Sequence, residues 1–266
     1  MFPEPKVSFL VLDYKKPIES RLLLESIRRH VKFPHKVIYL HNGYSQYSNI
    51  FLQESLIDQL IVTADNDGLG LGTRNLFAAC FSPFAIYVQN DQILGRDFTE
   101  EELGYLISFL GVETSDDKTI KSVSLAGDPC HGTYSERAHL IERYTYFEWE
   151  HQYMMPHGGA GPYHDIQWRE GYIQSLYKKY GWLHHIYHSP MFIDNGRSAN
   201  RQNPDGSEWK HFPDTKQLWL LKGPVKEKFV YPYFTDKEWQ EVLDTQKWPD
   251  GKIPEKEVEN SFHVWN

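Results

Sequence analysis

Residues 84–92 read FAIYVQNDQ, an apolar run rich in β-branched and aromatic side chains that ends abruptly at Asn90 and Asp91. The run predicts a buried strand. A strand that ends in a carboxylate holds that charge at the edge where α/β sheets bind ligands. Mg²⁺ and Mn²⁺ take oxygen ligands, commonly one or two carboxylates together with the phosphates of a substrate. The stretch therefore predicts either a metal site or an Asx turn that simply follows a strand.

Strand-like and helix-like segments alternate through the first hundred residues, which predicts a mainly parallel sheet with covering helices. The strands are expected at 7–12, 36–40, 60–63 and 84–91. Helices are expected from Pro17, over 73–80 after a glycine-rich turn at 66–72, and from a capping box of Thr99 and Glu102 to Gly111. The fold class is therefore α/β.

The pattern is looser after residue 116. Residues 122–126 predict another strand, and a long segment rich in histidine and aromatic residues follows to Gly161. Loops of that length usually cover a site. Helical spacing returns over 165–180, and Gly181 fits a C-terminal cap. We expect one domain at 1–205 and an aromatic, Pro-rich extension at 206–266 packed on it, with one more capped helix near Thr235.

Composition limits the class of protein. The 266 residues, 40% of them hydrophobic, fit one large α/β domain with an appendage. A net charge of −8 and a pI near 5.9 speak against a broad nucleic-acid or anionic-membrane surface. The two cysteines, Cys80 and Cys130, make a disulfide framework improbable, so a reducing compartment, the cytoplasm, is expected. Because strand-like sequence begins at Lys6, neither a secretory leader nor a membrane span is expected.

Other motifs accompany the strand that ends at Asp91. VLDYKKP at 11–17 follows the first strand, HNG at 41–43 ends the second, NDGLGLGTRN at 66–75 leads into a helix, and GGAGPYHDIQWRE at 158–170 opens another. In this order the motifs resemble those of the inverting glycosyltransferases of family 2. That family has the GT-A fold, a Rossmann-like arrangement with a mainly parallel central sheet and flanking helices. The resemblance covers residues 1–195.

The resemblance implies a pocket for a nucleotide-diphosphate sugar donor. Asp13 stands where the family usually has threonine, and His41 where it has the acidic residue that holds the base. Of the family's Asp-x-Asp signature only the last carboxylate is kept, at Asp91, which with His188 is expected to bind Mn²⁺ or Mg²⁺. The expected donor-binding residues are Asp13, Tyr14, Asn42, Arg74, Asn75 and Asn90. An ion pair on the surface remains an alternative for Arg74.

The resemblance also implies an acceptor side. Gly158, Gly159 and Trp168 would bind the acceptor, and Asp165 would be the catalytic base. In an inverting transfer the acceptor hydroxyl attacks the anomeric carbon opposite the leaving diphosphate, so a carboxylate that takes the proton contributes about 10²- to 10⁴-fold in rate. A simple helix cap is the alternative for Asp165.

The expected enzyme is a hexosyl- or pentosyltransferase (EC 2.4 type) of polysaccharide biosynthesis. Because the chain lacks the Gln-x-x-Arg-Trp motif of processive synthases, it is expected to transfer one sugar to a glycan or lipid-linked glycan. Three alternatives remain: a retaining transferase, a non-catalytic glycan-binding module, and a sugar nucleotidyltransferase, which needs a Gly-rich triphosphate loop where this chain has DYKKP.

Histidines at 184, 185 and 188 also raise the possibility of zinc. In a strand, however, His184 and His185 would face opposite sides, so at most one of them shares a site with His188.

Overall fold

The computed structural model describes residues 5–13, 17–43, 47–64, 68–126, 134–135, 137–154, 166–194, 201–202 and 208–209. The central strands are β1 (Val7–Asp13), β2 (His35–His41), β3 (Gln59–Val62), β4 (Phe84–Gln89), β6 (Thr119–Ser124), β7 (His139–Glu142) and β8 (Trp182–Ile186). The helices are α1 (Pro17–His30), α2 (Tyr47–Gln53), α3 (Gly68–Ala79), α4 (Glu100–Ile107), α5 (Arg143–Met154) and α6 (Ile166–Tyr180).

The central strands form one seven-stranded sheet in the order β3-β2-β1-β4-β7-β6-β8. β1 pairs in parallel with β2 and β4, β2 with β3, and β6 with β8, whereas β7 is antiparallel to both of its neighbours. Two short antiparallel pairs accompany the sheet, β5 (Gln92–Leu94) with β9 (Phe192–Asp194) and β10 (Arg201–Gln202) with β11 (Glu208–Trp209). The predicted α/β fold with a mainly parallel sheet is confirmed.

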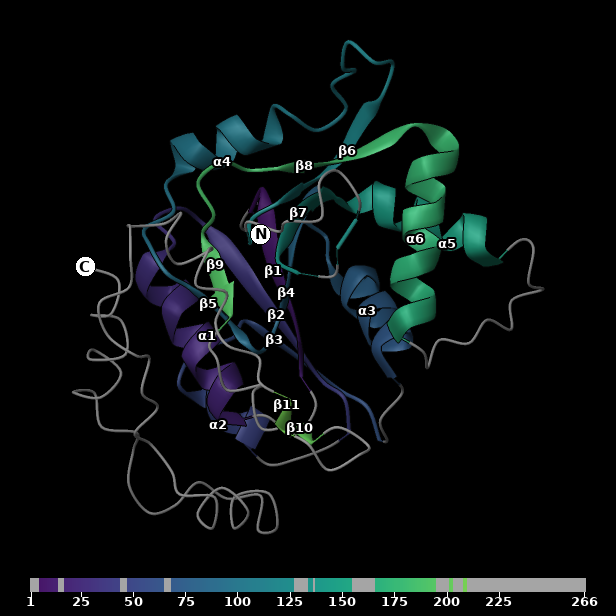
Figure 1. The fold of residues 1–266 in the computed structure, drawn as a ribbon. Helices are drawn as coiled ribbons and strands as arrows, with labels where there is room; N and C mark the ends of the chain where they lie inside the picture. The colour runs from purple at the N-terminus through teal and green to yellow at the C-terminus, as the bar shows by residue number, and fades with distance from the viewer. Residues whose placement is uncertain are drawn as a thin grey trace.

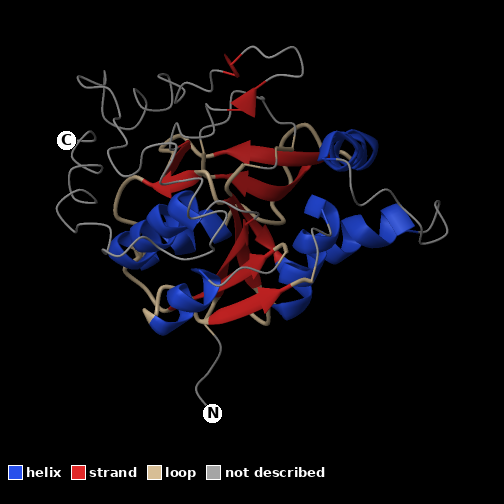
Figure 2. Ribbon diagram, turned by 90° about the horizontal axis from the view of Figure 1, so that it is seen from below, coloured by secondary structure: helices blue, strands red, loops and turns tan. Residues whose placement is uncertain are grey.

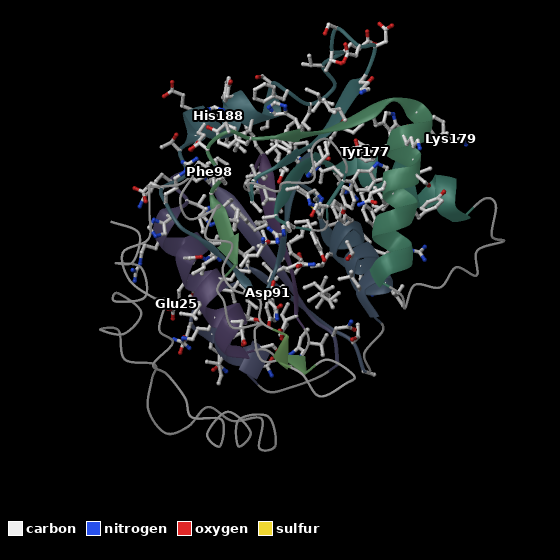
Figure 3. The ribbon with its side chains drawn as sticks, viewed as in Figure 1. Glu25, Asp91, Phe98, Tyr177, Lys179 and His188 are labelled. Atoms are coloured by element: carbon white, nitrogen blue, oxygen red, sulfur yellow. The ribbon has the colours of Figure 1, made fainter. Side chains whose placement is uncertain are left out.

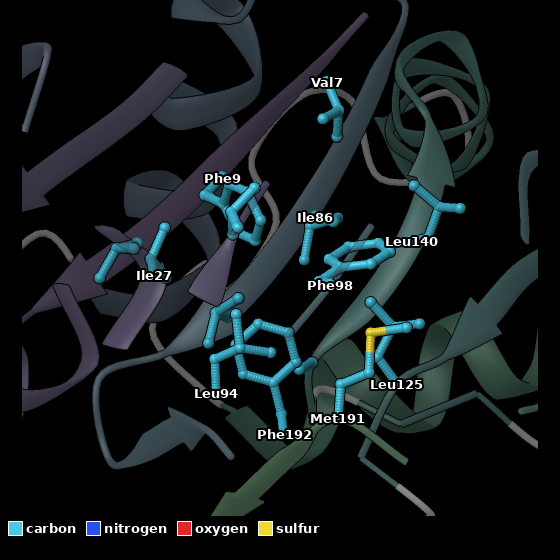
Figure 4. Packing of buried hydrophobic residues seen from close by; sticks show 14 of the residues in the cluster. Val7, Phe9, Ile27, Ile86, Leu94, Phe98, Leu125, Leu140, Met191 and Phe192 are labelled. Carbon is cyan, nitrogen blue, oxygen red and sulfur yellow. The ribbon is translucent and has the colours of Figure 1, made fainter. Parts of the chain in front are cut away.

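Helices cover both faces of the sheet (Figures 1 and 2). On one face Ile27 of α1 and Leu103 of α4 join a core that includes Phe9, Ile86 and Phe192, part of which Figure 4 shows. On the other face α3, α5 and α6 bury a second cluster, which contains Leu76, Phe77, Tyr146, Trp149, Ile173 and Tyr177. The hydrophobic effect thus explains the near-continuous apolar runs of β1 and β4, since both of their faces are covered.

The glycine-rich segment departs from the prediction. A turn was expected up to Gly72, but α3 already begins at Gly68 and includes the glycines at 70 and 72. Glycine normally disfavours a helix interior by about 1 kcal/mol relative to alanine, which is why the sequence indicated a turn. Close packing on β1 favours the small residue, because a Cβ on Gly72 would lie 2.7 Å from Leu12 Cδ1 and would force the Leu12 side chain to shift.

The long loop expected up to Gly161 is also wrong in part. Residues 139–154 form β7 and α5, where Leu140, Tyr146 and Trp149 are buried. β7 has four residues, and α5 mixes aromatic and polar residues without an apolar stripe, so neither gave a periodic signal. The short helix α2 was not predicted either.

The capped helix is confirmed at its start and shorter than expected at its end. Thr99 is the N-cap of α4, and its Oγ1 accepts a hydrogen bond from the backbone N of Glu102 at 3.2 Å. The helix ends at Ile107 with Ser108 as its C-cap, before Gly111. The carboxylate of Glu102 does not complete a capping box but binds Arg96 instead, with N···O distances of 2.9 and 2.6 Å.

The helix predicted over 165–180 is confirmed as α6, and Gly181 follows it with a φ of 66°. Beyond residue 205 only β11 is described, so the extension at 206–266 stays a prediction and the helix near Thr235 lies outside the described residues. Among the helices that the structure describes, none has the length and apolar character needed to cross a bilayer.

Candidate functional site

The polar residues that the sequence singled out meet at one edge of the sheet. Because β1, β2 and β4 are parallel and in register, with Asp13 opposite His41 and Leu12 opposite Gln89, their C-terminal ends lie side by side. Asn90 and Asp91 follow β4 directly. This is the edge at which open α/β sheets bind ligands.

Asp13 lies at the centre of this edge, and its carboxylate is fully buried. Asn90 Nδ2 donates a hydrogen bond to Asp13 Oδ1. His41 Nε2 lies 3.9 Å from Asp13 Oδ2, which is too far for a hydrogen bond. Burial lowers the pKa of His41, and the Asp13 carboxylate offsets part of that effect. Asp13 therefore connects β1 to the end of β4 from inside the protein.

Asn42 ties β2 to its neighbours. Its Nδ2 donates to the carbonyl of Gly68 at 3.0 Å, and its Oδ1 accepts from Thr63 Oγ1 at 3.0 Å. Thr63 Oγ1 also accepts from the backbone N of Gly43 at 2.8 Å. The hydrogen bonds of the Asn42 side chain thus hold the start of α3 over the end of β2. Thr63 was not named as a site residue in the sequence analysis, although its position at the end of a strand is a signal that could have identified it.

Asp91 is half-buried and lies on the two-residue turn between β4 and β5 (Figure 3). The next residue, Gln92, is fully buried, and its Oε1 accepts from the backbone N of Ala138 at 2.9 Å. β5 pairs with β9, where Gln92 lies opposite Asp194. The turn that carries Asp91 is therefore held at both ends.

Arg74 and Asn75 lie on α3, the helix that contacts β1 and β2, and both side chains are partly exposed. The structure thus brings Asp13, Asn42, Asn90 and Asp91 to one edge of the sheet and places Arg74 and Asn75 on the helix beside that edge.

The structure does not bring His188 to Asp91. His188 is exposed after β8, where its ring packs on that of Tyr187 with a centroid distance of 4.7 Å. Figure 3 shows it beside α4, well apart from Asp91. His184 and His185 face opposite sides of β8, as predicted: His184 is buried, whereas His185 is partly exposed. Within the described residues no group of three or more His, Cys, Asp or Glu side chains is placed to hold a metal ion.

The acceptor side falls largely outside the described residues. Gly158, Gly159 and Asp165 are not described, and only the backbone of Trp168 is, as part of α6. On the donor side, Tyr14 is not described either. Two hydrogen bonds hold the later part of α6 against its neighbours. Tyr177 OH and Ser122 Oγ are 2.6 Å apart, and Gln174 Nε2 donates to the carbonyl of Tyr134 at 2.9 Å. The helix that follows Asp165 is thus anchored to β6.

The donor chemistry of the strand ends suits a hard cation. Asp91 is a half-buried carboxylate at this edge, and its buried neighbour Asn90 carries an amide oxygen. Mn²⁺ and Mg²⁺ prefer such oxygen ligands and complete their shells with phosphate and water. The residues present therefore fit a divalent ion bound together with a diphosphate.

No family model matches the sequence, and no curated protein matches it either. Among solved structures the chain is similar to the mannosyltransferase PcManGT from Pyrobaculum calidifontis in complex with GDP-Man and Mn²⁺. The TM-score is 0.51 at 11% identity, over 70% of this chain and 55% of that chain. TarS 1-349 of S. aureus in complex with UDP gives a TM-score of 0.47 at 10% identity, over 70% of this chain and 59% of that chain. The chain thus spans less than two thirds of either protein. The likeness to the mannosyltransferase shows a GT-A-like fold.

Proposed function

We propose that this chain is a metal-dependent inverting glycosyltransferase. It moves one hexosyl or pentosyl group from a nucleotide-diphosphate sugar to a hydroxyl of a glycan or lipid-linked glycan. One observation carries the proposal: Asp13, Asn90 and Asp91 converge at the C-terminal edge of a GT-A-like sheet. The similar mannosyltransferase is a complex with GDP-Man and Mn²⁺, which supports a nucleotide sugar and a divalent ion as ligands here.

On the donor side Asp91 and Asn90 hold Mn²⁺ or Mg²⁺. When bound, the cation neutralises charge that develops on the leaving diphosphate. Tyr14, Arg74 and Asn75 complete the donor pocket, with Arg74 as a cation for the phosphates. Asn42 shapes the same pocket by fixing α3 over β2, as its hydrogen bonds to Thr63 and Gly68 indicate.

On the acceptor side Asp165 takes the proton of the attacking hydroxyl, and Gly158, Gly159 and Trp168 bind the acceptor. Asp165 directly precedes Ile166, the first residue of α6. Farther along α6, Tyr177 and Gln174 anchor this helix to Ser122 of β6 and to the carbonyl of Tyr134.

A binding screen followed by a transfer assay tests the proposal. Nucleoside diphosphates and their sugars are added with Mn²⁺ while thermal unfolding is followed, because a ligand at 100 times its Kd stabilises the folded state by about 2.7 kcal/mol. The best donor is then incubated with glycan acceptors, and NMR of the product reports the anomeric configuration. Inversion of that configuration is expected. Release of pyrophosphate from a nucleoside triphosphate and a sugar phosphate would indicate a nucleotidyltransferase instead, and binding of glycans without any nucleotide sugar would indicate a binding module.

A further inference from the structure

The turn at Asn90, Asp91 and Gln92 is held from both sides by buried side chains. Asn90 donates to the carboxylate of Asp13, and Gln92 accepts from the backbone N of Ala138. Asp91, between them, reaches the surface of the edge, whereas its two neighbours are buried.

We propose that Asp13 is a positioning residue for Asp91 that acts through Asn90, with Gln92 as a second anchor. This inference rests on the proposed function, because it concerns how Asp91 is presented to a divalent ion. It replaces the expectation that Asp13 touches the donor. In the structure the Asp13 carboxylate is fully buried and accepts a hydrogen bond from Asn90.

Asp13 is well suited to fix another residue. It is the last residue of β1, a strand held in parallel between β2 and β4, and its backbone carbonyl accepts from the N of Asn42 at 2.8 Å. The Asn90 amide is therefore tied to an acceptor on a strand that is paired on both sides, rather than left to rotate at the end of β4.

The effect on a metal ligand follows from this restraint. A carboxylate on a two-residue turn has many orientations unless its neighbours are fixed, and a metal selects only a few of them. Partners that orient a ligand without touching the metal typically contribute about 10- to 100-fold in affinity. We expect the bond between Asp13 and Asn90 to contribute within this range.

Mn²⁺ binding provides the test. The full chain is titrated with Mn²⁺ in the presence of a nucleoside diphosphate, and free Mn²⁺ is measured by electron paramagnetic resonance. We expect Asp13→Ala and Asn90→Ala each to weaken Mn²⁺ binding by about 10-fold or more. If Asp13 acts through Asn90, the double variant is no weaker than the worse single variant. Asp13→Asn retains an acceptor oxygen and is expected to recover most of the affinity.

A buried pair at the other end of β1 gives the matched control. Ser8 Oγ and Ser82 Oγ are 2.8 Å apart and buried, so Ser8→Ala removes a buried hydrogen bond from the same strand without touching the edge. This variant is expected to lower stability but to leave Mn²⁺ affinity unchanged. Equal weakening in Ser8→Ala would mean that general destabilisation explains the loss, which overturns the proposal.

The metal-free chain gives an independent readout. Amide hydrogen exchange of the segment from Gln89 to Leu94 is expected to rise in Asp13→Ala and in Gln92→Leu but not in Ser8→Ala. Normal Mn²⁺ affinity and normal exchange in Asp13→Ala overturn the positioning role while the proposed function stands. A wild-type chain that binds no Mn²⁺ with any nucleoside diphosphate overturns the metal dependence in the proposed function and this inference with it.

Discussion

Gly72 on α3 lies so close to Leu12 on β1 that a Cβ built on the glycine would be 2.7 Å from Leu12 Cδ1. The same Cβ would lie 3.6 Å from Asn42 Nδ2. This close approach brings the start of α3 down onto the strand ends, where Asn42 bonds the carbonyl of Gly68. Gly72 therefore allows close helix packing beside the candidate donor site.

Gly72→Ala is expected to destabilise the protein by about 1 kcal/mol. Overpacking of a core costs about 1–3 kcal/mol, and the better helix propensity of alanine returns about 1 kcal/mol. Gly104→Ala in α4 is the matched control, because nothing lies within 4 Å of its Cβ position, and it is expected to stabilise by about 0.5–1 kcal/mol. Urea denaturation measures both. If Gly72→Ala stabilises as much as Gly104→Ala, the steric explanation is wrong.

Much of the fold could be predicted because its strongest elements carry local signals. β1 and β4 are apolar runs buried on both faces, and α4 begins at a threonine cap. The elements that were missed depend on tertiary packing. α3 begins in a glycine stretch in which Gly72 packs closely on Leu12, and α5 mixes aromatic and polar residues without an apolar stripe.

Some features of the candidate site could likewise be predicted from local sequence, and others depend on tertiary packing. Asn90 and Asp91 could be predicted because a strand end places them at the ligand edge whatever the rest of the fold does. The use of Asp13 as an internal acceptor for Asn90 could not, since it depends on the pairing of β1 with β4, two strands separated by about seventy residues of sequence. The proposed partnership of His188 with Asp91 rested on order along the chain, and β8 leads His188 toward α4 instead.

Glu102→Gln is expected to destabilise the protein by about 2 kcal/mol. Its carboxylate receives both terminal nitrogens of Arg96 and the hydroxyl of Tyr187, and the Arg96 and Glu102 side chains are only 21% and 17% exposed. Hydrogen bonds to charged groups contribute about 1.5–3 kcal/mol, and an unpaired, half-buried guanidinium adds a cost. Glu101→Gln, in the same helical turn but exposed, is expected to change stability by less than about 0.5 kcal/mol in the same urea titration.

Stability is expected to fall when the pH is lowered from 7.5 to 5.5. Burial lowers the pKa of His30, His35, His41 and His185, so below about pH 6.5 the unfolded chain binds more protons than the folded one. Above the histidine pKa of the unfolded chain, the rings are neutral in both states and the protein has its full stability. As the pH falls toward the lower pKa values of the folded chain, that stability is lost. Urea denaturation at both pH values measures the difference.

His35→Gln tests the contribution of one group to that pH dependence. His35 Nδ1 lies 2.8 Å from the carbonyl of Phe33 and its Nε2 lies 3.3 Å from Arg28 Nη1, which fits a neutral ring that donates to the first and accepts from the second. Protonation would place two cations side by side. The variant is expected to have a smaller stability difference between pH 7.5 and 5.5 than the wild-type chain. An unchanged difference would remove His35 as a contributor.

Substitutions at Asp165 and Asp91 separate proton transfer from metal and donor binding in the proposed reaction. Asp165→Asn is expected to lower kcat by about 10²- to 10⁴-fold while the Kd for the nucleotide sugar stays near the wild-type value, because only the proton acceptor is lost.

Asp91→Asn is expected to weaken Mn²⁺ and donor binding together. EDTA is expected to abolish transfer by the wild-type enzyme, and added Mn²⁺ is expected to restore it. Calorimetry gives the Kd values and a radiolabelled donor gives kcat. Near-normal turnover in Asp165→Asn would exclude it as the base, and transfer that persists in EDTA would contradict a metal at Asp91.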